Sequence, residues 1–219
     1  NLAATATTGN MTDSGALAIT GTSSFTTSAN NATIALNTTT NAFTGAVTIT
    51  TNDNSGTDAD VTIDGGTTAL ILAASTIDGD LTVRSGNASG ITDDEATVTV
   101  GGNLAATTDA NNGVINLGSL AVDGTIALQT HGSGNATVVN DAGLNFAAST
   151  VGGIFNATAT TGNIVDSGAL TIAGAAKFIT GVDGSDIILD SSANAFSGSV
   201  TFQADAGNET FGNITFVDS

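Results

Sequence analysis

The sequence contains no cysteine, proline, tryptophan or tyrosine, and it has only two basic residues, Arg84 and Lys177, among its 219. Without cysteine, the chain lacks the disulfide framework that holds many small secreted domains together. Twenty acidic residues leave a formal net charge of −18. This balance argues against nucleic-acid binding, which needs Lys and Arg to neutralise phosphates, and against docking on an anionic membrane surface.

Long apolar runs are also missing. The longest, at residues 69–74, has six residues, whereas a membrane-spanning helix needs about 20, so we expect no membrane insertion. Hydrophobic residues still make up 40% of the chain, which argues against disorder. Thr, Val and Ile punctuated by Gly, Asn and Asp predict an all-β protein.

The chain contains copies of itself. Residues 4–25, ATATTGNMTDSGALAITGTSSF, return at 157–178 as ATATTGNIVDSGALTIAGAAKF, with 15 of 22 positions identical and no gap. The same offset of 153 residues relates NAFTGAVTI at 41–49 to NAFSGSVTF at 194–202. Self-similarity of this kind is typical of a repeat architecture.

A shorter unit lies inside the long repeat: an alternating apolar strand, a glycine, and a second such strand, as in FTGAVTI and IDGDLTV. We interpret the central glycine as a corner, where it allows a positive φ or a tight turn. The corner glycines are Gly21, Gly45, Gly79, Gly102, Gly124, Gly153, Gly174, Gly198 and Gly212.

This unit predicts a parallel β-solenoid of about nine coils, each of roughly 22 residues, stacked at about 4.8 Å per coil. Residues 1–219 would form one solenoid segment, a piece of a longer protein or the subunit of a filament. The period is interrupted at 51–60 and 85–95, and we expect loops that protrude from the rod there. Neither end of the sequence resembles a cap.

The runs GNMTDSGALAITGT and STVGGIFNATATTGNIVDSGALTIAG resemble the repeats of filamentous haemagglutinin-type proteins. Those are large bacterial surface or secreted proteins, exported by two-partner secretion or as autotransporter-like passengers. The resemblance implies a right-handed parallel β-helix, an extracellular or cell-surface location, and a role as stalk, adhesin or filament.

Acidic clusters are the main candidates for a bound ion, since calcium takes six to eight oxygen ligands from carboxylates, carbonyls and water. No EF-hand loop or glycine-rich nonapeptide array is present. The sequence therefore favours solvated acidic turns, and calcium binding by these residues is the weaker alternative. The candidates are Asp53, Asp58 and Asp60 in one loop, Asp93, Asp94 and Glu95 in a second, and Asp183, Asp186 and Asp190 in a third.

No catalytic constellation is readable, so we expect no enzyme activity and no required cofactor. His131 is the only histidine and has no partner at a set spacing, which favours a surface position. Arg84 and Lys177 lie 93 positions apart, which weakens the hypothesis of a polysaccharide lyase. The Thr-x-Thr pairs are too irregular to favour an ice-binding protein.

Two functions remain open from sequence. The first is a structural segment of an extracellular fibre, stalk or filament, with neighbouring repeats or other copies as end-to-end partners. The second is an adhesin that binds a glycan or a cell surface through its loops, which the absence of Trp and Tyr weakens. The flanking sequence would separate them best.

Overall fold

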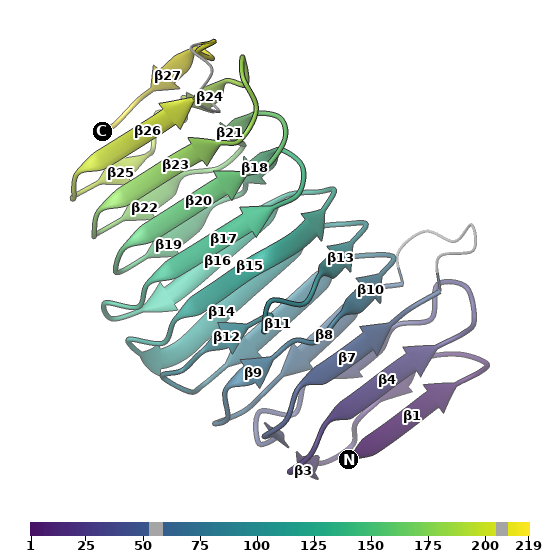
Figure 1. Cartoon of the computed structure of the whole chain (residues 1–219). Helices are drawn as coiled ribbons and strands as arrows, with labels where there is room; N and C mark the ends of the chain where they lie inside the picture. Colours follow the sequence, from purple (N-terminus) through teal and green to yellow (C-terminus); the bar gives the residue numbers. More distant parts are fainter. Residues whose placement is uncertain (53–58, 205–209) are drawn as a thin grey trace.

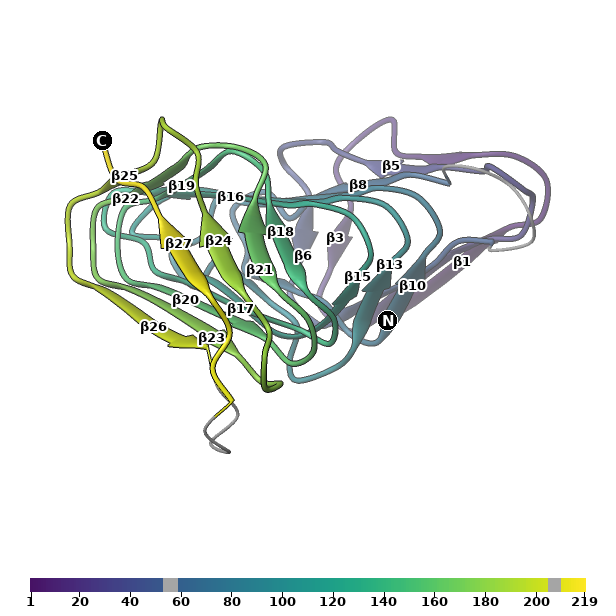
Figure 2. The ribbon, with the colours of Figure 1, turned by 90° about the horizontal axis from the view of Figure 1, so that it is seen from above.

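The computed structural model describes residues 1–52, 59–204 and 210–219. These form an all-β parallel solenoid of about nine turns, with about 22 residues per turn, which confirms the predicted fold class. In Figure 1 the chain runs left to right in front, returns behind, and advances from bottom to top, so the coil is right-handed. Seen from above, the coils lie behind one another around a common interior (Figure 2).

Two long sheets run along the solenoid, and every strand pairing between named strands is parallel. The first sheet follows the order β1 (Leu2–Ala6), β4 (Ser23–Thr27), β7 (Val47–Thr50), β10 (Ser75–Ile77), β13 (Val98–Val100), β15 (Ile115–Val122), β17 (Ala136–Asn140), β20 (Phe155–Ala159), β23 (Ala176–Thr180) and β26 (Val200–Ala204). The second follows β2 (Met11–Thr12), β5 (Ile34–Leu36), β8 (Val61–Asp64), β11 (Leu81–Ser85), β14 (Leu104–Asn111), β16 (Ile126–His131), β18 (Leu144–Phe146), β21 (Ile164–Asp166), β24 (Ile187–Leu189) and β27 (Ile214–Phe216).

Seven short strands complete the turns, and they change role along the axis. They are β3 (Ala18–Ile19), β6 (Ala42–Phe43), β9 (Leu70–Ile71), β12 (Ile91–Thr92), β19 (Ser149–Val151), β22 (Leu170–Ile172) and β25 (Ala195–Phe196). β3 and β6 form a separate third side near the N-terminus, β9 and β12 join the first sheet, and β19, β22 and β25 join the second. In the central coils, β14 and β15 are eight residues long, and two long sides replace three short ones.

Alternation along each strand builds the core. In β11 the burial pattern alternates residue by residue, with Leu81 and Val83 buried and Thr82 and Arg84 exposed. The apolar side chains of successive coils therefore stack into one cluster from Phe25 to Ala204. Near the C-terminus this core is aromatic: Phe178 contacts Phe155 edge-to-face, with ring centroids 5.6 Å apart, a favoured geometry for aromatic pairs.

The expected loops need a correction. Residues 85–95 do not form a protruding loop, because β12 within them pairs with both β9 and β15. The remaining residues form two short turns, at 86–90 before β12 and at 93–95 after it. In the other interruption, 53–58 lie outside the described residues, while the Thr51 amide donates to the Thr76 carbonyl at 2.9 Å. None of the described residues forms a helix long and apolar enough to cross a bilayer.

Candidate functional site

The corner glycines stack on one another from coil to coil. Gly45 lies over Gly21, Gly124 over Gly102, and the Gly174 amide donates to the Gly153 carbonyl at 3.1 Å. A Cβ placed on Gly174 would lie 2.4 Å from that carbonyl oxygen. Glycine is therefore required by close approach of the backbones, since contacts this short do not accommodate a side chain.

Of the two alternatives for these corners, a positive φ and a tight turn, the positive φ is found at other glycines. None of the nine predicted corner glycines is among the described glycines with positive φ, which are Gly9, Gly66, Gly90, Gly132, Gly162 and Gly184. Eight of the nine lie in turns between consecutive strands. Gly212 instead precedes β27, where a Cβ would lie 1.8 Å from the Ser185 carbonyl oxygen.

Beside the corners, Asp and Asn side chains connect neighbouring coils. The Asp60 carboxylate accepts a hydrogen bond from the Asp80 amide at 2.8 Å, and the Asp80 carboxylate accepts one from the Asn103 amide at 2.6 Å. The Asn103 side chain in turn accepts from the Thr125 amide at 2.8 Å. This ladder satisfies backbone donors at places where the chain leaves the sheets, a demand that every turn must meet.

Three buried asparagines make similar bonds inside the solenoid, and sequence reasoning missed them. Asn41, Asn140 and Asn194 have at most 1% of their surface exposed. The side-chain Oδ1 of Asn194 accepts from the Leu170 amide at 2.8 Å, and its NH2 group donates to the Asp166 carboxylate at 2.6 Å. The sequence NAF, which occurs at both 41–43 and 194–196, could have revealed two of them. An asparagine that stands before the same two apolar residues in both copies suggests a buried side chain with a hydrogen-bond partner inside the protein.

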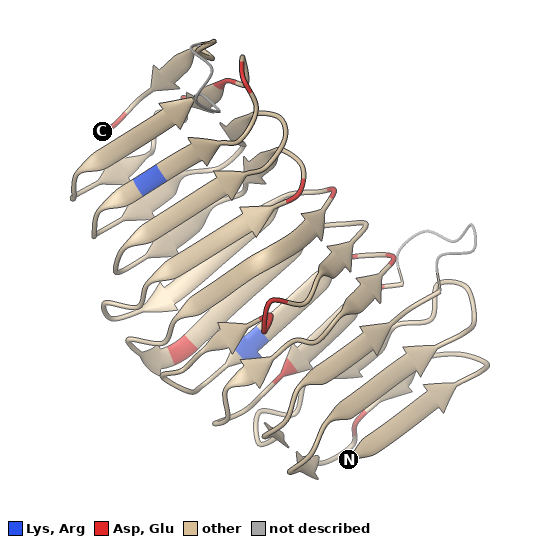
Figure 3. Ribbon diagram, viewed as in Figure 1, with Lys and Arg blue, Asp and Glu red and all other residues tan. Residues whose placement is uncertain are grey.

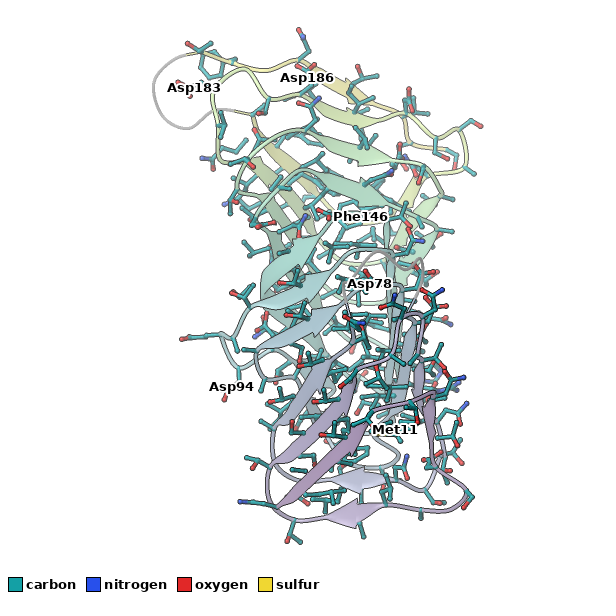
Figure 4. All side chains as sticks on the ribbon, turned by 90° about the vertical axis from the view of Figure 1, so that its right-hand side faces the viewer. Met11, Asp78, Asp94, Phe146, Asp183 and Asp186 are labelled. Carbon is teal, nitrogen blue, oxygen red and sulfur yellow. The ribbon has the colours of Figure 1, made fainter. Side chains whose placement is uncertain are left out.

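The calcium candidates are distributed among different coils. Asp53 and Asp58 lie outside the described residues, and Asp60 belongs to the ladder above. The Asp186 carboxylate accepts from the Asn213 amide at 2.7 Å. Asp183 lies in the turn before β24, and Asp183 and Asp186 are both near the C-terminal coil (Figure 4). Asp190 is exposed, and its amide donates to the Asp166 carboxylate at 3.0 Å.

The second acidic cluster combines a buried and an outward carboxylate. Asp93 is 3% exposed, and its side chain accepts from the Ser119 amide at 2.6 Å. Asp94 and Glu95 have φ of 47° and 61°, and Asp94 points away from the core (Figure 4). Within the described parts of the chain, no group of three or more His, Asp or Glu side chains is placed to hold a metal ion.

This turn borders a shallow surface depression of about 650 Å³ with a polar lining. It is lined by Thr92, Asp93, Asp94, Glu95, Asn116, Gly118 and Ser119. No aromatic side chain is among them, so the depression offers hydrogen bonds and negative charge but no stacking platform.

The two basic residues lie on different sheets, Arg84 in β11 and Lys177 in β23, as the separate blue segments of Figure 3 show. Arg84 forms an ion pair with Asp109, and the hydrogen bond and charge of that carboxylate raise the pKa of Arg84 above its ordinary value. Burial raises the pKa of nearby Asp64, while the hydrogen bond from the Gly66 amide partly opposes this. His131 is exposed at the end of β16. The structure therefore does not bring Arg84, Lys177 and His131 together at one site.

The family described as "Repeats of unknown function (DUF5649)" matches residues 1–50 and 133–203, which is more than half of the chain. The protein therefore belongs to this family of repeats, and here those repeats form a parallel β-solenoid. The matched segments cover the coils near both ends, whereas the unmatched centre contains the long strands β14 and β15. No curated protein and no solved structure matches the chain.

Proposed function

We propose that this chain is a structural repeat segment of an extracellular bacterial fibre, stalk or filament, and that its work is mechanical, without catalysis. The observation that carries the proposal is the continuity of the two sheets. Each follows a path of ten parallel strands from the first coil to the last. In such a solenoid each coil contacts mainly its neighbours, so the rod can be lengthened by adding coils that make the same kind of contacts.

The two end coils support end-to-end continuation. Leu2 in β1 is 36% exposed, and Ile214 in β27 is 48% exposed, although their counterparts in inner coils are buried. Phe211, which precedes β27, is 70% exposed. Strand edges of this kind pair with further strands when these are offered, so both faces are suited to another coil.

The proposed location rests on sequence. The repeats resemble those of filamentous haemagglutinin-type proteins, and the acidic, cysteine-free composition is compatible with an exposed surface in a salty medium. Antibodies raised against residues 1–219 provide the test, in immunogold electron microscopy of the bacteria that make the protein. We expect label along thin surface or secreted fibres. Label confined to the cell interior would overturn the proposal.

The depression beside Asp93 and Asp94 favours one alternative, an adhesin that binds a polar glycan there. Its lining of carboxylates, an amide and hydroxyls can hydrogen-bond sugar hydroxyls. A glycan array probed with the folded chain tests this, with Asp94→Ala as the variant. A ligand whose binding weakens in Asp94→Ala would support the alternative, and a blank array would remove it.

A further inference from the structure

The 153-residue sequence repeat is also a structural repeat. Strands β1 to β8 correspond in order to β20 to β27, and six of the eight pairs of counterparts lie in the same long sheet. The exceptions are β3 and β6, which form a separate sheet, whereas their counterparts β22 and β25 join the second sheet. Seven steps along the first sheet lead from β1 to β20. Residues 1–66 and 154–219 are thus the same part of a seven-coil period.

Side-chain contacts also repeat at the same position in the seven-coil period, and we call this position the phase of a coil. The Asn41 NH2 group donates to Asp13 at 2.7 Å, and Asn194, 153 positions later, donates to Asp166 at 2.6 Å. Each asparagine oxygen also accepts a backbone amide of the preceding coil at 2.8 Å. The equivalence therefore extends to buried polar contacts, which require a specific register.

The outer face of the last coil has a covered counterpart inside the same chain. β26 and β27 correspond to β7 and β8, and in the interior β10 and β11 cover β7 and β8. There the Val61 amide donates to the Asp80 carbonyl at 2.8 Å, and Val61 is 1% exposed. Its counterpart, Ile214, is 48% exposed.

The outer face of the first coil has a different counterpart. β1 corresponds to β20, and β20 is covered by β17 through five residue pairs, from Ala136↔Phe155 to Asn140↔Ala159. A second copy placed end to end would bring β1 onto β26, a pairing with no equivalent inside the chain. The first and last coils are thus in different phases.

We propose that the face formed by β26 and β27 binds a coil in the phase of residues 67–85, and not the β1 coil of a second copy. This inference rests on the proposed function, because it specifies how the solenoid continues. The full repeat would then comprise seven coils and rise about 34 Å, at about 4.8 Å per coil.

Two fusions of equal length test the phase. In the in-phase fusion, the full chain is followed directly by a second copy of residues 67–219, because Ser219 corresponds to Gly66. In the out-of-phase fusion, the full chain is followed by residues 1–153. Both additions contain 153 residues, so chain length is matched. Hydrogen exchange at the Ile214 amide and denaturant unfolding followed by circular dichroism are compared with the unfused chain.

We expect exchange at Ile214 to slow at least about tenfold in the in-phase fusion, and little in the out-of-phase one. The in-phase fusion should also unfold in a transition with a larger m-value, since more surface is exposed together. Equal protection of Ile214 in both fusions would support end-to-end continuation but overturn the proposed phase preference. Protection only in the out-of-phase fusion would have the same two consequences. Protection in neither would overturn both the phase and the proposed continuation.

Discussion

Replacing Gly174 with alanine tests the reason for the corner glycines. Gly174 lies at the corner between β22 and β23, and its amide donates to the Gly153 carbonyl of the preceding coil at 3.1 Å. An added Cβ would meet that carbonyl oxygen at 2.4 Å, its carbon at 2.5 Å and the Ile154 nitrogen at 2.8 Å. All three atoms belong to the backbone, so no side-chain rotation relieves the overlap.

The loss of folding free energy in Gly174→Ala follows from the distance that the two corners must move apart. Restoring an ordinary contact of about 3.5 Å moves the two corners apart by about 1 Å, which breaks the Gly174–Gly153 hydrogen bond. Overpacking costs about 1–3 kcal/mol, and the lost hydrogen bond adds about 1 kcal/mol. We expect a loss of about 3 kcal/mol, or roughly 6–12 °C in Tm for a chain of this size.

Gly15→Ala is the matched control. Gly15 lies in an exposed turn without positive φ, and an added Cβ would meet nothing within 4 Å. We expect this variant to be neutral or slightly stabilised, because alanine restricts the unfolded chain. Urea unfolding followed by circular dichroism compares both variants with the parent. Equal stability of Gly174→Ala and Gly15→Ala would refute close approach as the reason for the corner glycines.

Three further predictions concern polar groups. Asn194→Ala should cost about 2–4 kcal/mol in urea unfolding, because it leaves the buried Leu170 amide without its acceptor; a cost below about 0.5 kcal/mol would contradict this role. Asp93→Ala should cost about 1–3 kcal/mol through the lost acceptor of a backbone amide, while Asp94→Ala should change stability little, and the reverse order would count against the assignment. Asp64→Asn should stabilise the protein at neutral pH. Burial raises the pKa of Asp64 in the folded state, so the wild type loses stability as pH rises above the ordinary Asp range. The difference in unfolding free energy between Asp64→Asn and the wild type should vanish at pH values below the ordinary Asp pKa range. A difference that stays constant across the pH series would exclude titration of Asp64 as its cause.

Local patterns in the sequence were sufficient to predict the strands, corners and inward residues of a single coil. Period-two alternation identifies the inward residues of strands such as β11, and glycines between alternating segments mark the corners. The similarity of residues 4–25 to residues 157–178 is visible without coordinates. Repetition at a fixed spacing forces successive coils into the same shape, because each must bury its apolar side chains against the one before.

The contacts between coils were decided only by the tertiary structure. From the sequence we expect a positive φ or a tight turn at the corner glycines, a protruding loop near residues 85–95, and solvated acidic turns with Asp60 and Asp93 as weak calcium candidates. Each assignment depended on atoms about 20–28 positions away: Gly153 lies against Gly174, Ile91 pairs with Leu70 and Ile115, and Ser119 donates to Asp93.

The sequence by itself therefore determined the solenoid, its period and its inward face, because these follow from periodicity within a single coil. The tertiary structure decided the change from three sides to two in the central coils and the polar bonds between coils. The physical reason is that backbone donors and close contacts are satisfied by whichever residue lies in the next layer. That residue depends on the number of residues in each individual turn, which periodicity gives only on average.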